Sequence, residues 1–330
     1  MKLLLFNLQL FATNVTTQQS LSAENKTYYD KLLIKTADPD LVYDQFGQKK
    51  PIPKNGGKKI EFRKFSPLAK ALTPLTEGVT PTGKQLTVTK IEAEVAQYGD
   101  YVETSDVLQL TAIDPIVVET TKLIGSQAGR TLDTVTREVL MGGTNKAFAP
   151  KSDGTIVTQR DQLDATCIFT PKLVYEAERI LKRQNAPKIN GKYVAIIHPD
   201  VSADIMKNDQ FIEVTKYASQ QGTFKGEIGT IANTRFVEST EAKIWNDDTC
   251  PVGLAVYGIL FVGENAYGVT EVTGGGLRTI IKSLGSAGTA DPLDQRSTIG
   301  WKAIKTAERL VEQYMLRYEC VSSAGNVEAN

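Results

Sequence analysis

The sequence predicts an α+β fold, because one long helical stripe stands apart from several groups of strand-like segments. Residues 115–141 carry apolar side chains at helical spacing. Residues 58–65 and 86–95 alternate like two strands of a hairpin, and residues 254–262 (LAVYGILFV) form the most apolar strand. The chain has 330 residues, of which 41% are apolar and 23% charged, so it can hold two domains and a sizeable core.

Residues 1–48 read as an extended arm with one short helix. Four apolar residues have roughly helical spacing within residues 21–36, and Asp38-Pro39 then ends or redirects the chain. An arm with so few apolar residues does not form a core of its own. We therefore expect it to lie on the rest of its own chain or on a neighbour.

The start of the chain, MKLLLFNLQLFAT, does not read as a signal peptide. Asn7 and Gln9 interrupt the apolar run, and no clear small-x-small cleavage site follows. A membrane span needs a run of about 18 apolar residues, and the sequence has none. We therefore predict no membrane partner.

Residues 51–95 predict a long projecting hairpin around a Pro-, Thr- and Gly-rich loop at 66–84. The alternation changes parity at Lys90, which predicts a β-bulge. Residues 49–70 are strongly basic and residues 90–106 acidic. Either the two strands pair their own charges, or a basic flap lies on an acidic neighbouring subunit. On the second interpretation the inter-subunit contacts include Lys58, Lys59, Arg63, Lys64, Glu92 and Glu94.

Residues 115–141 predict a long spine helix. Asp114 is a good N-cap, Pro115 suits the first helical position, and Gly142-Gly143 ends the helix. Gly125 and Gly129 form a G-x-x-x-G step, which in a soluble helix predicts close approach of another element. The predicted apolar stripe consists of Ile116, Leu123, Ile124, Ala128, Leu132, Val135 and Val139.

Residues 150–263 predict a compact α/β insertion. It contains a helix over 171–184, a buried strand over 193–197, a second helix over 201–208, and strands over 235–238 and 254–262. Beyond it, residues 267–272 and 277–283 suggest a hairpin around three glycines at 274–276. Residues 301–320 fit either a helix or, at YMLRYEC, a strand.

The sequence contains no recognisable catalytic, cofactor-binding or metal-binding motif. His198, the one histidine, precedes Pro199-Asp200 and lacks a nucleophile motif, so we interpret it as a turn-stabilising residue. Cys167, Cys250 and Cys320 are far apart and lack metal-ligand spacing, which indicates free thiols. Asp247-Asp248 reads as a solvated turn. We therefore predict no enzymatic activity, no catalytic or metal residues, and no cofactor.

Four segments resemble one family: AIIHPD (195–200), GEIGTIANTRF (226–236), YGILFVGENAY (257–267) and DPLDQRSTIGWK (291–302). These segments are similar to the major capsid proteins of tailed bacteriophages, in the group named after the coat protein of coliphage N-four. The last segment carries the structural signature of the resemblance, namely Asp291, Pro292, Gln295, Arg296, Gly300 and Trp301. We expect Asp291-Pro292 to form a turn and Trp301 to anchor a core.

The resemblance implies the tailed-phage major capsid fold, also called HK-97-like. It divides the chain into an N-terminal arm (1–48), an extended loop (49–100), the spine helix with the first part of a peripheral domain (101–149), an axial domain (150–265) and a return to the peripheral domain (266–330).

The function implied by the resemblance is self-assembly into the hexamers and pentamers of an icosahedral virion head around double-stranded DNA. Assembly would take place in the host cytoplasm, with a separate scaffolding protein, a portal and decoration proteins as partners. The resemblance implies non-specific contact with the packaged DNA, and the balance of 38 basic and 38 acidic residues argues against tight binding. Three other readings stay open: an encapsulin-like compartment shell, a cytosolic enzyme that uses His198, and an adhesion or tail module.

Overall fold

The computed structural model describes residues 22–37, 41–52, 57–65, 68–111, 116–208, 227–271, 277–286 and 288–330. The chain divides into two compact units. Unit 1 comprises residues 1–38, 99–128 and 277–302, and unit 2 comprises residues 39–98, 129–276 and 303–330. Three elements contribute residues to both units: α3 (Ile116–Met141), β4 (Ala96–Ser105) and β13 (Arg296–Lys305).

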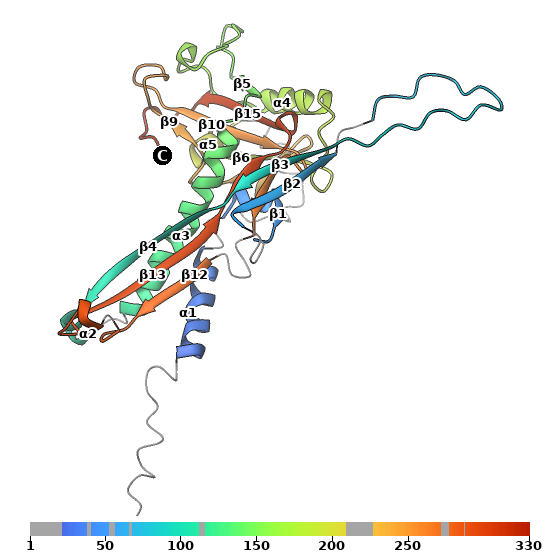
Figure 1. The fold of residues 1–330 in the computed structure, drawn as a ribbon. Helices are drawn as coiled ribbons and strands as arrows, with labels where there is room; N and C mark the ends of the chain where they lie inside the picture. The colour runs from blue at the N-terminus through green and yellow to red at the C-terminus, as the bar shows by residue number, and fades with distance from the viewer. Residues whose placement is uncertain are drawn as a thin grey trace, which may run out of the picture. The chain divides into compact units, whose positions relative to one another are not determined.

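Unit 1 contains a sheet in the order β12-β13-β4, with β12 at Leu277–Lys282. Its helices are α1 (Ser22–Ala37), the short α2 (Asp106–Thr111) and the first half of α3 (Figure 1). At Gly125 of α3 an added Cβ would lie 3.0 Å from Thr36 Cβ and 3.2 Å from the Leu33 carbonyl oxygen of α1. The close approach predicted for the G-x-x-x-G step is therefore confirmed at Gly125, where a Cβ would crowd the neighbouring helix.

Unit 2 is built on a large sheet in the order β5-β15-β10-β6-β8-β7, with β9 paired to β10. The strands are β5 (Lys146–Phe148), β6 (Tyr193–Ile197), β7 (Glu227–Ile231), β8 (Thr234–Glu238), β9 (Ile244–Trp245), β10 (Val256–Val262) and β15 (Met315–Val321). Helices α4 (Pro171–Arg183) and α5 (Pro199–Met206) belong to the same unit. The helix and strands predicted for residues 171–262 are thus confirmed, with ends shifted by a few residues.

Both faces of this sheet are buried, which explains why its central strands are apolar throughout. On β6, Tyr193, Ala195 and Ile197 belong to the core that includes α4 and α5. Val194 and Ile196 point to the other core, which includes the last residues of α3. Side chains alternate between the faces of a strand, so a strand covered on both sides needs apolar residues at every position.

The remaining strands of unit 2 form a small sheet and a hairpin. The small sheet has the order β1-β11-β14, from β1 (Gln48–Lys50), β11 (Tyr267–Thr270) and β14 (Ala307–Arg309). The hairpin pairs β2 (Lys59–Phe65) with β3 (Val88–Glu94), and a long loop joins the two strands (Figure 1). Short 3₁₀ turns lie at Tyr43–Gln45, Arg160–Gln162, Gly288–Ala290 and Glu312–Tyr314.

Two predictions about the strands are wrong. The β2–β3 register runs without interruption through the Arg63–Lys90 pair, so there is no bulge at Lys90. The parity change arises because Leu86 and Val88 are 57% and 43% exposed and do not belong to the buried face. Strands β11 and β12 do not form a hairpin with each other, because each pairs with strands distant in sequence. The three glycines between them lie outside the described residues.

The predicted apolar stripe of the spine helix is partly wrong. Leu123 is 72% exposed, whereas Asp133, Thr136 and Arg137 are buried. Polar partners in the core of unit 2 compensate for the burial of these polar side chains, so hydropathy alone misplaces the buried face. The ambiguous segment 301–320 is resolved as strands, namely the end of β13, β14 and most of β15.

Candidate inter-subunit surfaces

The outer face of the β2–β3 hairpin carries only charged residues from the Lys59–Glu94 pair to the Arg63–Lys90 pair. Ile60 and Phe62 point to a buried cluster, so their neighbours Lys59, Glu61 and Arg63 point outward. On β3 the outward residues are Lys90, Glu92 and Glu94. This alternation is why the hairpin can be basic on one strand and acidic on the other without burying charge.

Charges on this face pair diagonally. Glu61 lies directly opposite Glu92, and Arg63 lies opposite Lys90, so the direct neighbours repel each other. Lys59 Nζ instead reaches Glu92 at 2.8 Å, and Lys90 Nζ reaches Glu61 at 3.4 Å. The hydrogen bond from Lys59 lowers the pKa of the Glu92 carboxyl.

Four of the six predicted contact residues remain without an ion partner in the described part of the chain. These are Lys58, Arg63, Lys64 and Glu94. Lys59 and Glu92 bind each other. The structure therefore brings together one pair and leaves the other four charges available.

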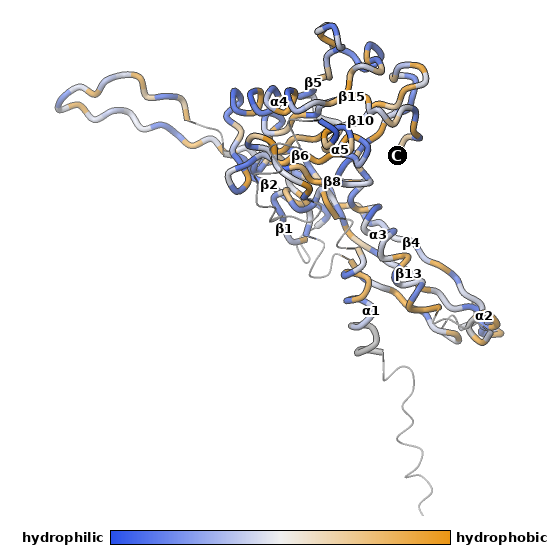
Figure 2. The backbone as a smooth tube through the Cα atoms, turned by 180° about the vertical axis from the view of Figure 1, so that it is seen from behind, coloured by the Kyte–Doolittle hydropathy of each residue, from blue (hydrophilic) through white to orange (hydrophobic). Residues whose placement is uncertain are grey.

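The loop that joins the two hairpin strands exposes a series of large apolar side chains. They are 57–83% exposed and separated by polar residues (Figure 2). The set consists of Leu68, Leu72, Leu75, Val79 and Leu86. Leucines spaced along a polar segment are the sequence signal for this surface. The contact residues predicted from the sequence were all charged and did not include these apolar side chains.

The signature residues between 291 and 301 form a turn and pack strands and helices together in unit 1. Asp291 is 7% exposed, and its Oδ2 accepts a hydrogen bond of 2.8 Å from the Arg296 backbone N–H. The Gln295 carbonyl oxygen accepts a hydrogen bond of 3.0 Å from the Asp106 N–H at the start of α2. Pro292 is exposed at the tip of the turn. The first half of the signature therefore builds a turn and attaches α2 to it.

The second half of the signature holds two strands and a helix together. At Gly300 an added Cβ would lie 2.7 Å from Tyr101 Cβ and 2.8 Å from the Asp100 carbonyl oxygen, so β13 and β4 need glycine here. Trp301 is 3% exposed, and its Nε1 donates a hydrogen bond of 3.2 Å to Gln127 Oε1 on α3. Gln127 in turn donates to Asp100 Oδ2 at 2.7 Å.

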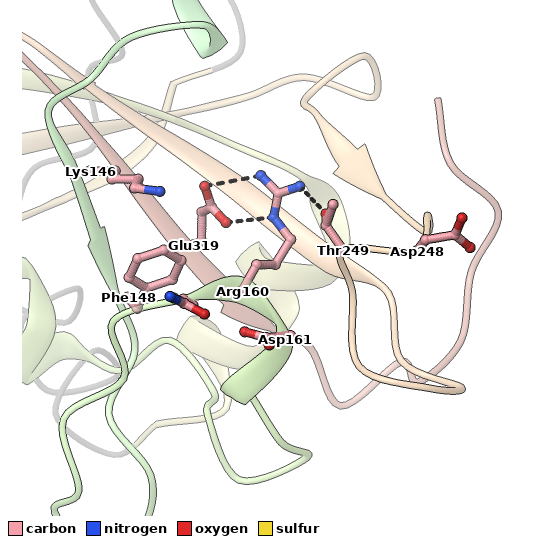
Figure 3. A pocket seen from close by; sticks show the side chains of 8 residues that line it. Lys146, Phe148, Arg160, Asp161, Asp248, Thr249 and Glu319 are labelled. Carbon is pink, nitrogen blue, oxygen red and sulfur yellow. Dashed lines mark hydrogen bonds and ion pairs between the residues drawn. The ribbon is translucent and has the colours of Figure 1, made fainter.

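A pocket of about 420 Å³ opens on unit 2 beside β5 and β15 (Figure 3). Arg160 Nε lies 2.7 Å from Glu319 Oε2, and its guanidinium lies 4.0 Å from the centre of the Trp245 ring. Glu319 is 1% exposed and also binds Arg317 at 2.8 Å. Asp161 and Asp248 line the pocket from two different loops. No motif in the sequence predicts this site.

His198, the three cysteines and Asp247 have ordinary structural roles or no partner that indicates enzymatic chemistry. His198 caps α5, and its Nδ1 accepts a hydrogen bond of 3.2 Å from the Asp200 N–H, which is the turn-stabilising role predicted for it. Burial lowers the pKa of the imidazole. Cys167, Cys250 and Cys320 are free. Asp247 Oδ1 accepts a hydrogen bond of 2.9 Å from the Thr249 N–H, as in an ordinary turn.

The described part of the chain shows neither a metal-binding cluster nor a membrane-spanning helix. No group of three or more His, Cys, Asp and Glu side chains in the ranges given above is arranged to hold a metal ion. Within the same ranges, no helix is both long enough and apolar enough to cross a membrane.

A family model described as "Phage capsid protein" matches residues 88–307. None of the curated protein sequences compared with the chain matches it. Solved structures with a similar fold include a capsid protein of Ralstonia phage GP4, with 14% identity and a TM-score of 0.67 over 83% of this chain and 86% of that one. A capsid protein of the cyanophage P-SCSP1u has 13% identity and a TM-score of 0.62 over 86% and 89%.

A third similar structure is the capsid asymmetric unit of cyanophage Pam1, with 12% identity, a TM-score of 0.59, and coverage of 81% of this chain and 86% of that one. These similarities confirm the α+β, HK-97-like fold predicted from the sequence. The family match does not favour a compartment shell or an enzyme. The chain belongs to the phage capsid protein family and is a major capsid protein, a component of the virion shell.

Proposed function

We propose that this capsid protein assembles into hexamers and pentamers through an extended loop (49–100) that lies on an adjacent subunit. The observation that carries the proposal is the loop between β2 and β3. Leu72 and Leu75 are 83% and 77% exposed. Apolar side chains concentrated on one segment mark a contact surface, because water alone is an unfavourable neighbour for them. A neighbouring copy would cover them.

The charges at the base of the loop support the same role. Lys58, Arg63, Lys64 and Glu94 have no ion partner among the described residues, so they are available to an adjacent subunit. Lys59 and Glu92 stay in the proposed contact as an internally paired couple. Such charges contribute to register and specificity more than to affinity.

The same proposal assigns roles to the axial domain, the arm and the peripheral domain. The axial domain (150–265) would contact its symmetry mates, and the arm (1–48) would bind a further copy. The peripheral domain would comprise residues 101–149 and 266–330. The sequence segments quoted above support membership of the coliphage N-four group.

The proposed partners are a separate scaffolding protein, a portal, decoration proteins and packaged double-stranded DNA, with assembly in the host cytoplasm. The balance of 38 basic against 38 acidic residues supports weak, non-specific contact with DNA.

Electron microscopy of the expressed chain, alone and together with its genomic neighbours, tests the proposal. We expect capsomers or closed shells. A variant in which residues 68–86 are replaced by a short Gly-Ser turn should fold and remain unassembled. A control that keeps the loop length and changes only Thr80 and Thr82 to Ser should assemble like the parent chain. A parent chain that stays monomeric under all conditions contradicts the proposal, and fibres would favour a tail module.

A further inference from the structure

We propose that helix α4 of one copy binds the pocket of a second copy of this chain through opposite charges. The inference rests on the self-assembly proposed above and names two surfaces of unit 2 that meet. The first is called the acidic loops, residues 151–166 and 246–253, which border the pocket. The second is called the basic face, the exposed side of α4.

The acidic loops carry five aspartates against Lys151 and Arg160. Asp164 binds Lys151 at 3.4 Å, and Arg160 shares the buried Glu319 carboxylate with Arg317. The aspartates at 153, 164 and 247 accept hydrogen bonds within their own turns. Asp161 and Asp248 have no hydrogen bond or ion pair in the described part of the chain, and both residues line the pocket. Figure 3 shows Asp161 beside Arg160 and Asp248 at the outer edge, with its carboxylate directed away from Arg160. Two unpaired carboxylates therefore border one open cavity.

The floor of the pocket is fixed in position. Arg160 lies over the Trp245 ring and binds both Glu319 and, at 2.8 Å, the Thr249 hydroxyl. One cation, Lys146, lies on the wall beside Phe148, with its Nζ 5.4 Å from the centre of that ring. A fixed floor with free acids at the rim suits a long cationic side chain with an apolar stem.

The basic face has the complementary composition. Lys172, Tyr175, Arg179 and Arg183 are exposed and recur every three or four residues, so they form one stripe on the helix. Arg179 and Arg183 have no ion partner within the described ranges, whereas Lys182 binds Glu178 at 2.6 Å. Glu176 is the one exposed acid of α4. Tyr175 is 54% exposed, and tyrosine and arginine are the side chains most typical of interface hot spots.

The two surfaces lie on different sides of unit 2, so one copy does not pair them within itself. On β15, Leu316, Tyr318 and Cys320 point to the core that includes α4, whereas Glu319, which lines the pocket, points to the other face of the strand. A contact between different surfaces of two identical chains is head-to-tail, and such a contact closes a ring when the rotation between copies allows it. The arrangement fits the ring of a capsomer.

Charge reversal tests the inference. The acid-reversed variant carries Asp161→Lys and Asp248→Lys, and the base-reversed variant carries Arg179→Glu and Arg183→Glu. Each should lower the yield of capsomers or shells about tenfold or more, which corresponds to a loss of about 1.4 kcal/mol. Sedimentation and electron microscopy measure the yield. Thermal unfolding close to that of the parent chain shows that each variant is folded.

Two further results separate a specific contact from a general effect of charge. An equimolar mixture of the two variants should form mixed rings, because basic loops of one then meet an acidic α4 of the other. The variant with all four reversals should recover assembly. A matched control with Glu264→Lys and Lys302→Glu, both exposed and outside the two surfaces, should assemble like the parent.

Reversed variants that assemble like the parent chain overturn the inference and leave the proposed function intact. The inference is also overturned if neither the mixture nor the four-residue variant recovers assembly. A parent chain that never assembles contradicts the proposed function itself, so the two failures are distinguishable.

Discussion

Two groups of opposite charges in unit 2 use the same residue types in opposite surroundings. On the outer face of the hairpin, Lys59 and Glu92 lie 2.8 Å apart, with 67% and 49% of their side chains exposed. In the core, the Lys305 ammonium contacts Asp44 Oδ2 and is 0% exposed, and the Thr136 hydroxyl donates to Asp44 Oδ1 at 3.0 Å. Water screens the first pair, whereas only protein groups stabilise the second.

The difference shows that burial decides how much a charge pair matters to folding. An exposed ion that loses its partner is solvated by water, so little changes. A buried ion that loses its partner stays uncompensated in a medium of low polarity. The core group adds a second carboxyl, Asp133, which is 0% exposed and accepts a hydrogen bond of 2.8 Å from the Tyr43 N–H. Four substitutions test this comparison.

The largest effect is expected for Lys305→Met. The substitution leaves the Asp44 carboxylate buried without its cation, which costs about 3–5 kcal/mol of unfolding free energy. Urea unfolding measures the loss. Adding Asp44→Leu should restore much of the stability, because the pair is then replaced by apolar groups. A Lys305→Met variant as stable as the parent chain would contradict the importance of burial for this charge pair.

A smaller loss is expected for Thr136→Val, which keeps the shape of the side chain and removes its hydroxyl. The hydrogen bond to the Asp44 carboxylate is charge-assisted, so its loss costs about 1.5–3 kcal/mol. The matched control is Thr134→Val on the same helix, since Thr134 is only partly buried and its hydroxyl lies 3.5 Å from Glu241. Equal losses in the two variants would argue against a special role for the buried carboxylate.

The next effect depends on pH. Burial, with the nearby Asp44 carboxylate, raises the pKa of Asp133 well above its ordinary value. The folded state therefore binds more protons than the unfolded state, and stability falls as pH rises from the unfolded pKa of about 3.9 through the raised folded pKa. Asp133→Asn should remove this slope and be more stable than the parent at neutral pH by on the order of 1 kcal/mol.

Urea unfolding at several pH values measures the slope for Asp133→Asn. Lys305, Arg137 and Tyr43 also face the cluster, so Tyr43→Phe serves as a control that should keep the slope of the parent chain. If the stability difference between Asp133→Asn and the parent chain stays constant over this pH range, Asp133 does not take up a proton on folding and the prediction is wrong.

The smallest effect is expected for Lys59→Met on the hairpin. Unfolding should not change measurably, because both partners are solvated. The pKa of Glu92 should rise toward its ordinary value, since the hydrogen bond from Lys59 is the main cause of its lowering. Carboxyl titration by NMR measures this shift. A marked drop in thermal stability would show that the exposed pair matters as much as the buried one.

Local patterns in the sequence predicted much of the fold. The Gly142-Gly143 stop signal of α3 and the apolar run of β6 predict the bounds of those elements nearly correctly, while Asp114 and Pro115 lie outside the described residues. The hairpin strands follow from alternation, and the cap at His198 follows from its place before Pro199-Asp200. Each of these elements depends on residues close together in the sequence. The chemistry of neighbouring residues therefore determines where the element begins, ends or turns.

Other features depend on residues far apart in the chain. Asp44, Asp133 and Lys305 come from three segments, and no local pattern signals that they meet. Leu123 was assigned to the buried stripe by its hydropathy, yet the neighbours of α3 leave it exposed. The pocket likewise combines residues near 146, 160, 248 and 319, and no local pattern signals that these segments meet.

The sequence by itself determined the element types, the phage capsid resemblance and the charged composition of the hairpin, because spacing and residue chemistry are local properties. Tertiary structure alone decided which charges are buried, which face of α3 is covered, and which strands pair. Strand pairing and burial depend on contacts between distant segments, and the dielectric environment of a charge is a property of the packed chain. The same lysine–carboxylate pair is therefore a surface contact on the hairpin and a structural requirement in the core.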